Sequence, residues 1–157
     1  MARDHLLLDA SGYSVLMMCF GVGALMGAIL IAGNHGHVPR GVVLTFCSIA
    51  LGVAIFVFGL SISVPLSGAM LFVSGLTMMG NNALINGMVQ ERVPDALRAR
   101  VMGLYITVYI GAHPIGAALS GWCARNFGVS LTVATMGALL FIAATWVFRR
   151  YPELRGA

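Results

Sequence analysis

The sequence predicts an all-α membrane protein of about five transmembrane helices. Hydrophobic residues make up 59% of the 157 residues and charged residues only 9%, whereas soluble domains carry about 25% charged residues. Five stretches also lack any Asp, Glu, Lys or Arg, and each is close to or above the ~20 residues that a helix needs to cross a bilayer. A water-soluble fold of this size could not cover its surface with so few charges, so the lipid bilayer is the expected surroundings of the chain.

The five stretches define the predicted organisation of the chain. Inside hydrocarbon every backbone N–H and C=O group must be bonded within the protein, so each stretch is expected to be a helix. The predicted bundle covers 13–148 and its helices are 13–32, 41–60, 65–89, 101–123 and 129–148. Residues 149–157 are expected to form a tail.

The arginines predict the orientation of this bundle. Connections on the cytoplasmic side of a membrane carry the excess of positive charge. One side of the predicted bundle carries only Arg3 and Arg125, whereas the other carries seven arginines: Arg40, Arg92, Arg98, Arg100, Arg149, Arg150 and Arg155. The sequence therefore predicts a multi-pass protein of the cell membrane with its N-terminus outside and its C-terminus in the cytoplasm.

Several other classes of function find no support in the residues. The net charge is +4, but the arginines are spread over short connections and form no nucleic-acid patch. His35 and His37 form a His-x-His without further ligands nearby, so no metal site is predicted. The three cysteines lie in separate apolar stretches and show no pairing pattern. Catalytic and nucleotide-binding motifs are missing, so neither an enzyme nor a cofactor is expected.

The third stretch carries a row of amide side chains. Asn82, Asn86 and Gln90 follow one another at a spacing of four, which keeps them near one face of a helix, and Asn81 lies beside them. Exposing an amide to lipid costs a few kcal/mol, so this face is expected to point into protein or a cavity. Asn82 and Asn86 are candidates for lining a polar pathway; the alternative is an interhelical hydrogen-bond ladder that holds the bundle together.

The fourth stretch carries Tyr105, Tyr109 and His113, again at a spacing of four, with His113 near the middle of the span. An ionisable side chain at this depth suggests function. Pro114 cannot donate to the carbonyl of Ile110, so a kink is expected there. This face is predicted to line a route for an amphipathic small molecule. The alternative places Tyr105 in the aromatic belt and makes His113 a neutral packing residue.

Small residues predict where helices pack closely. Membrane helices are held together by packing, and small residues let their backbones approach. The expected contact residues are Gly21, Gly23 and Gly27 in the first stretch and Gly116 and Ser120 in the fourth.

Residues 93–128, VPDALRARVMGLYITVYIGAHPIGAALSGWCARNFG, resemble the segment that joins helices ten and eleven of major facilitator superfamily exporters. The similarity is to the branch of enterobactin-exporter-like and transmembrane secretion effector permeases, which has a Val-Pro-Asp-x-Leu-Arg-x-Arg-Val segment before a helix with Pro-x-Gly near its middle. Residues 11–30 similarly resemble helix eight. Ala99 departs from the pattern, because the branch favours Gly at that place.

The resemblance implies a fold and a function. Residues 1–12 would be the end of helix seven and an extracytoplasmic loop. The five stretches would be helices eight to twelve, most of the C-terminal six-helix half of a transporter whose substrate site lies between two halves. The expected function is efflux of small amphipathic molecules, coupled to an ion, with this chain as an incomplete C-terminal fragment and the N-terminal half as its missing partner. The alternative is a standalone small membrane protein that acts by helix association with a partner subunit.

The resemblance also implies a role for the charged segment 90–100. Comparable segments of these permeases make charge and helix-end contacts that hold the cytoplasmic gate in one state. The candidates form an expected gate loop of five residues: Glu91, Arg92, Asp95, Arg98 and Arg100. The alternative is that these arginines only set the topology.

Overall fold

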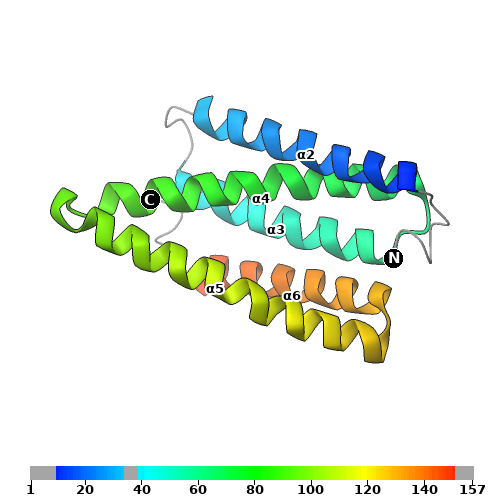
Figure 1. The fold of residues 1–157 in the computed structure, drawn as a ribbon. Coiled ribbons are helices and arrows are strands. Elements are labelled where there is room, and N and C mark those ends of the chain that lie inside the picture. Colours follow the sequence, from blue (N-terminus) through cyan, green and yellow to red (C-terminus); the bar gives the residue numbers. More distant parts are fainter. Residues whose placement is uncertain (1–9, 34–38, 151–157) are drawn as a thin grey trace.

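The computed structural model describes residues 10–33 and 39–150, which form five α-helices (Figure 1). The helices are α2 (Ala10–Gly33), α3 (Arg40–Leu60), α4 (Val64–Arg92), α5 (Asp95–Phe127) and α6 (Val129–Arg150). The described residues contain no strand, and all five helices are long and apolar enough to cross a membrane. The predicted all-α membrane fold is therefore confirmed.

The helices extend further than the apolar stretches at their charged ends. α4 continues through Arg92 and α5 begins at Asp95, so only Val93 and Pro94 separate the two helices. The prediction of a loop over 90–100 is wrong for most of its length. Charged residues end an apolar stretch, but Glu and Arg are good helix formers and continue a helix. Val93 leaves the helix because the residue before a proline disfavours the helical conformation.

The other described connections are equally short. Residues 61–63 join α3 to α4, where the Ser67 hydroxyl donates to Ser61 Oγ at 3.1 Å and Ser61 donates to the carbonyl of Ser63 at 3.2 Å. Gly128 alone separates α5 from α6 and has a φ of 86°. A residue with a side chain rarely adopts that conformation, which explains a glycine at this sharp reversal.

α2 packs on α4 through backbone contact (Figure 1). A Cβ atom placed on Gly23 would lie 2.0 Å from the carbonyl oxygen of Phe72, and one on Gly27 would lie 2.1 Å from that of Leu76. From the other side, a Cβ on Gly75 would lie 2.1 Å from the carbonyl oxygen of Phe20. The two helices can approach this closely only because these three positions lack side chains.

α3 packs on α6 by the same device. Cβ atoms on Gly52, Gly59 and Gly137 would all lie within 3 Å of atoms of the facing helix. The Ser130 hydroxyl also donates to the carbonyl of Gly59, which joins the first turn of α6 to the last turn of α3. α4 contacts α3 as well, so the helices are connected in the order α2, α4, α3, α6.

α5 is held differently from the other four helices. It lies against α6 and only lightly against α4, from which it diverges after Pro94 (Figure 1). None of its residues is buried, and Leu104, Ile115 and Leu119 are each at least 60% exposed. The helix continues without interruption through Pro114. One long apolar helix therefore presents most of its surface outward from the bundle.

Candidate functional site

The amide row of α4 lies partly between helices and partly at the end of the bundle. Asn82 and Asn86 are half-buried, whereas Gln90 is exposed. The Asn86 side chain donates from Nδ2 to the backbone carbonyl of Asn82 at 2.8 Å. Asn81 Oδ1 is buried and has no hydrogen-bond partner among the described residues. The amides therefore do not form a continuous ladder between helices.

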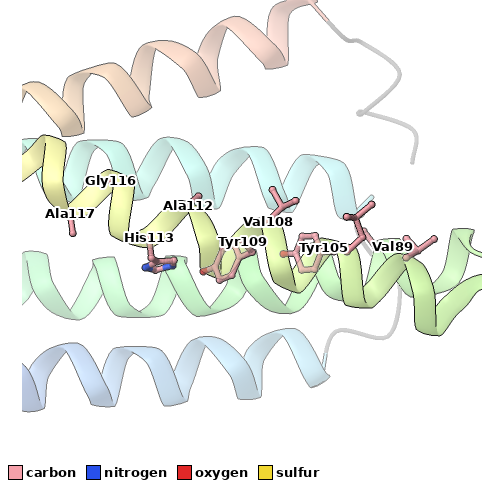
Figure 2. Close-up of a pocket in the computed structure, with 10 residues that line it drawn as sticks. Val89, Tyr105, Val108, Tyr109, Ala112, His113, Gly116 and Ala117 are labelled. Carbon is pink, nitrogen blue, oxygen red and sulfur yellow. The ribbon is translucent and has the colours of Figure 1, made fainter.

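The aromatic row of α5 forms a ladder of ring contacts along the helix. The rings of Tyr105 and Tyr109 are stacked, with centroids 6.0 Å apart and an interplanar angle of 16°. The imidazole of His113 meets the Tyr109 ring edge-on at 5.2 Å and 73°. Figure 2 shows these side chains reaching from α5 toward α4. The spacing of four residues places the three rings on one face, as the sequence predicted.

One hydrogen bond joins the two rows. The Tyr109 hydroxyl donates to Asn82 Oδ1 at 3.2 Å. This bond lies where the two helices otherwise barely touch. Tyr109 is thus held on three sides, by Tyr105, His113 and Asn82. The two candidate faces, identified separately from the sequence, converge at this tyrosine.

A groove of about 930 Å³ opens along this face of α5. Its lining combines the aromatic ladder with small and aliphatic side chains: Val89, Val101, Leu104, Tyr105, Val108, Tyr109, Ala112, His113, Gly116 and Ala117 (Figure 2). No Asp, Glu, Lys or Arg lines it. The volume is that of a small-molecule site, and apolar walls with a few polar groups are typical of such sites.

The groove residues that the sequence analysis missed could have been found by helical spacing. Val101, Val108, Ala112 and Gly116 lie on the same face of α5 as Tyr105 and Tyr109, at steps of three and four residues. Gly116, expected to pack against another helix, has no atom within 4 Å of the place its Cβ would take. Val89 comes from α4, and no local pattern indicated it.

The remaining small residues take two different positions. Gly23 and Gly27 contact the backbone of α4, whereas a Cβ on Gly21 would have nothing within 4 Å. The Ser120 hydroxyl donates to the carbonyl of Ala117 at 3.1 Å, a bond within its own helix.

The charged segment between α4 and α5 contains two ion pairs. Glu91 pairs with Arg40 and so connects the end of α4 to the start of α3. Arg98 pairs with Asp95 at 2.6 Å within the first turns of α5. In the described part of the chain, neither Arg92 nor Arg100 lies within ion-pair distance of a carboxylate. The sequence analysis did not foresee the Arg40–Glu91 pair, because the partners lie 51 residues apart.

The described residues form no arrangement that could bind a metal ion. They contain no group of three His, Cys, Asp or Glu side chains that could hold an ion. His35 and His37 lie outside the described residues. The groove therefore offers aromatic faces, two phenol hydroxyls and one imidazole, and the Asn82 amide that bonds to Tyr109 lies next to this tyrosine.

Curated proteins similar to this chain are described as multidrug efflux pumps. The chain is 29% identical over 139 residues to the multidrug efflux pump Tap of Mycobacterium tuberculosis strain H37Rv. The aligned residues make up 88% of this chain and 33% of the relative. It is 27% identical over 141 residues to Tap of Mycolicibacterium fortuitum, covering 89% of this chain and 34% of the relative. The chain thus spans about a third of the length of these relatives. No solved structure matches it significantly.

The match to a family model is more extensive. The model of the transmembrane secretion effectors matches residues 1–155, nearly the whole chain, and confirms the resemblance inferred from residues 93–128. On the basis of this match and its five apolar helices, the chain belongs to the transmembrane secretion effector family of the major facilitator superfamily.

Proposed function

We propose that this chain forms helices eight to twelve of an efflux permease for small amphipathic molecules, and that the groove between α4 and α5 is part of the substrate route. The observation that carries the proposal is an uncharged groove within the membrane-spanning helices, lined by Tyr109 and His113, with Asn82 bonded to Tyr109. Aromatic faces with isolated polar groups can hold apolar or weakly cationic molecules in several poses. The relatives described as multidrug efflux pumps support the same reading.

A transport assay tests this proposal. The complete gene product that contains this chain would be expressed in a host that lacks its major efflux pumps, and everted membrane vesicles would be supplied with fluorescent amphipathic compounds. Energised vesicles with the protein are expected to accumulate at least one compound faster than vesicles without it. Equal rates for every compound across a chemically broad panel would contradict efflux.

The exposed surface of α5 supports a second part of the proposal, a facing helical half encoded in the same gene or as a separate chain. Cβ atoms on Gly103, Gly111 and Gly121 would have nothing within 4 Å, and small residues suit close helix contacts. A standalone protein that associates with another subunit would use the same surface. An immunoblot of native membranes separates these cases: a band more than twice 16.5 kDa favours one long chain, and a band at that mass favours a separate partner.

The proposed orientation places the ends of α4 and α6 in the cytoplasm. In the described residues this end of the bundle carries six arginines, whereas the opposite end carries Arg125 alone. Fluorescent-protein fusions after Arg150 are expected to fluoresce and alkaline phosphatase fusions there to be inactive, with the reverse result for fusions at Ser63. The opposite pattern at both sites would overturn the orientation.

The ion pair between Arg40 and Glu91 is proposed to hold the cytoplasmic gate. The single change Glu91→Arg is expected to lower transport several-fold, since it replaces the attraction between these two side chains by repulsion between like charges. The double change Arg40→Glu with Glu91→Arg restores the pair and leaves the number of arginines at this end unchanged, so it should recover transport. A double variant as inactive as the single one, with normal membrane insertion, would argue against the gate role.

His113 is proposed to help determine which compounds are exported. It lies in the groove, is exposed, and touches the Tyr109 ring. A polar side chain at membrane depth suggests a functional role, and this imidazole is one of the few polar groups that line the groove. His113→Ala in the complete transporter is expected to change the relative rates at which a panel of compounds is exported. A variant with the same substrate range as the parent would exclude His113 as a determinant of substrate choice.

A further inference from the structure

A second cavity, which shares only Val89 with the α4–α5 groove, lies at the arginine-rich end of the bundle. It has a volume of about 350 Å³, and α3 contributes Leu44, while the end of α4 and the residue after it contribute the rest: Ile85, Met88, Val89, Arg92 and Val93. Five of these six side chains are apolar, and Arg92 is the one that carries a charge. The pocket therefore combines a slot without hydrogen-bonding groups and a single cation.

The charges around this pocket leave Arg92 available for an anion. The described residues at this end carry two carboxylates, and each is engaged: Glu91 with Arg40 and Asp95 with Arg98. Arg92 is exposed and lies within ion-pair distance of no carboxylate among the residues described. Its guanidinium group can therefore present several N–H donors to a phosphate, with which arginine forms strong bidentate contacts.

The position of the pocket along α3 and α4 indicates which kind of ligand it can bind. Arg92 is the last residue of α4, and Leu44 and Ile85 lie one to two turns deeper along their helices. Apolar cavities are poor sites for water, and in a membrane the neighbouring apolar material is the acyl chains of lipids. Basic pockets between helices at the cytoplasmic side of a membrane suit anionic headgroups.

We propose that this pocket binds an anionic phospholipid, with its phosphate at Arg92 and the upper part of an acyl chain between Leu44, Ile85 and Met88. The site needs both parts, the cation at the mouth and the apolar slot beneath it. It differs from general attraction of lipids to the six arginines at this end, because a single one of them lines the slot. The proposal does not depend on transport.

Lipid binding to the purified full chain tests this site. In an uncharged detergent, the shift of the unfolding temperature would be titrated with dioleoyl phosphatidylglycerol, dioleoyl phosphatidylcholine and glycerol 3-phosphate. Phosphatidylglycerol is expected to bind and the other two to bind at least about tenfold more weakly, since each lacks a net charge or an acyl chain. Equal shifts with phosphatidylcholine, or with glycerol 3-phosphate alone, would overturn the proposal.

Three variants distinguish lipid binding in the pocket from general attraction of the lipid to the arginines at this end. Arg92→Gln is expected to weaken phosphatidylglycerol binding by about tenfold, the loss expected for one hydrogen-bonded charge. Leu44→Trp fills the slot and should weaken binding while Arg92 remains. Arg100→Gln removes the same charge at the same end but outside the pocket, and should change binding by less than about threefold. Equal losses for Arg92→Gln and Arg100→Gln, or full binding by Leu44→Trp, would contradict the site.

Discussion

Replacing Gly27 with alanine is expected to separate α2 from α4 and to destabilise the protein by about 2 kcal/mol. The added Cβ would lie 2.1 Å from the carbonyl oxygen of Leu76, and backbone atoms cannot move aside as the end of a side chain can. Overpacking typically costs about 1–3 kcal/mol, and a clash with backbone atoms places this change at the upper end of that range. The gain of about 1 kcal/mol that alanine brings over glycine within a helix offsets part of this cost. Gly23→Ala should behave alike, since its Cβ would lie 2.0 Å from the carbonyl oxygen of Phe72.

Gly21→Ala provides the matched control on the same helix. It brings the same change of helix propensity, but its Cβ would have nothing within 4 Å. Thermal unfolding in detergent is expected to show a lower midpoint for Gly23→Ala and Gly27→Ala and an unchanged or higher one for Gly21→Ala. If all three variants unfold at the same temperature, α2 and α4 do not pack as closely at Gly23 and Gly27 as described here.

Replacing Tyr109 with alanine is expected to reduce transport by the complete protein by more than about tenfold. The side chain stacks on Tyr105, touches His113 and donates a hydrogen bond to Asn82. Its removal therefore takes away the ring at the centre of the groove and the bond that joins α5 to α4. Tyr109→Phe keeps the ring and removes only the hydroxyl, so a loss of about fivefold is expected from one hydrogen bond of about 1 kcal/mol.

Ile110→Ala serves as the control for Tyr109. Ile110 is the next residue on α5, is 61% exposed and does not line the groove. Initial rates in everted vesicles, normalised to the amount of protein in the membrane, are expected to fall for Tyr109→Ala and to stay within about twofold for Ile110→Ala, the size of effect usual for a surface change. Tyr109 has no special role if both variants lose the same fraction of activity.

The helices of this protein could be predicted from the sequence because the bilayer imposes their length and their internal hydrogen bonds. The convergence of Asn82 and Tyr109 was also within reach, since each lies on a polar or aromatic face that has to avoid lipid. The C-terminal end of α4 and the N-terminal end of α5 could not be predicted in this way. A search for uncharged stretches stops at Glu91 and Arg100, whereas a helix continues through such residues.

The arrangement of the helices could not be predicted. Nothing in the glycines of α2 says whether they meet α3, α4 or another helix, since small residues permit a close contact without choosing its partner. The exposure of α5 was also hidden, because in a membrane an apolar residue can face either lipid or another helix. The Arg40–Glu91 pair depends on the packing of α3 beside α4, and so only the folded chain reveals it.

Protection of the groove by a transported compound tests the central claim most directly. In the complete protein, with its native cysteines replaced, Ala112→Cys would place one thiol in the groove between Tyr109 and Gly116. The rate of its reaction with a maleimide would be measured with a compound that the same protein exports and with one that it does not. If α4 and α5 line the substrate route, the exported compound slows the reaction and the other does not. An unchanged rate with a saturating exported compound would place the route elsewhere.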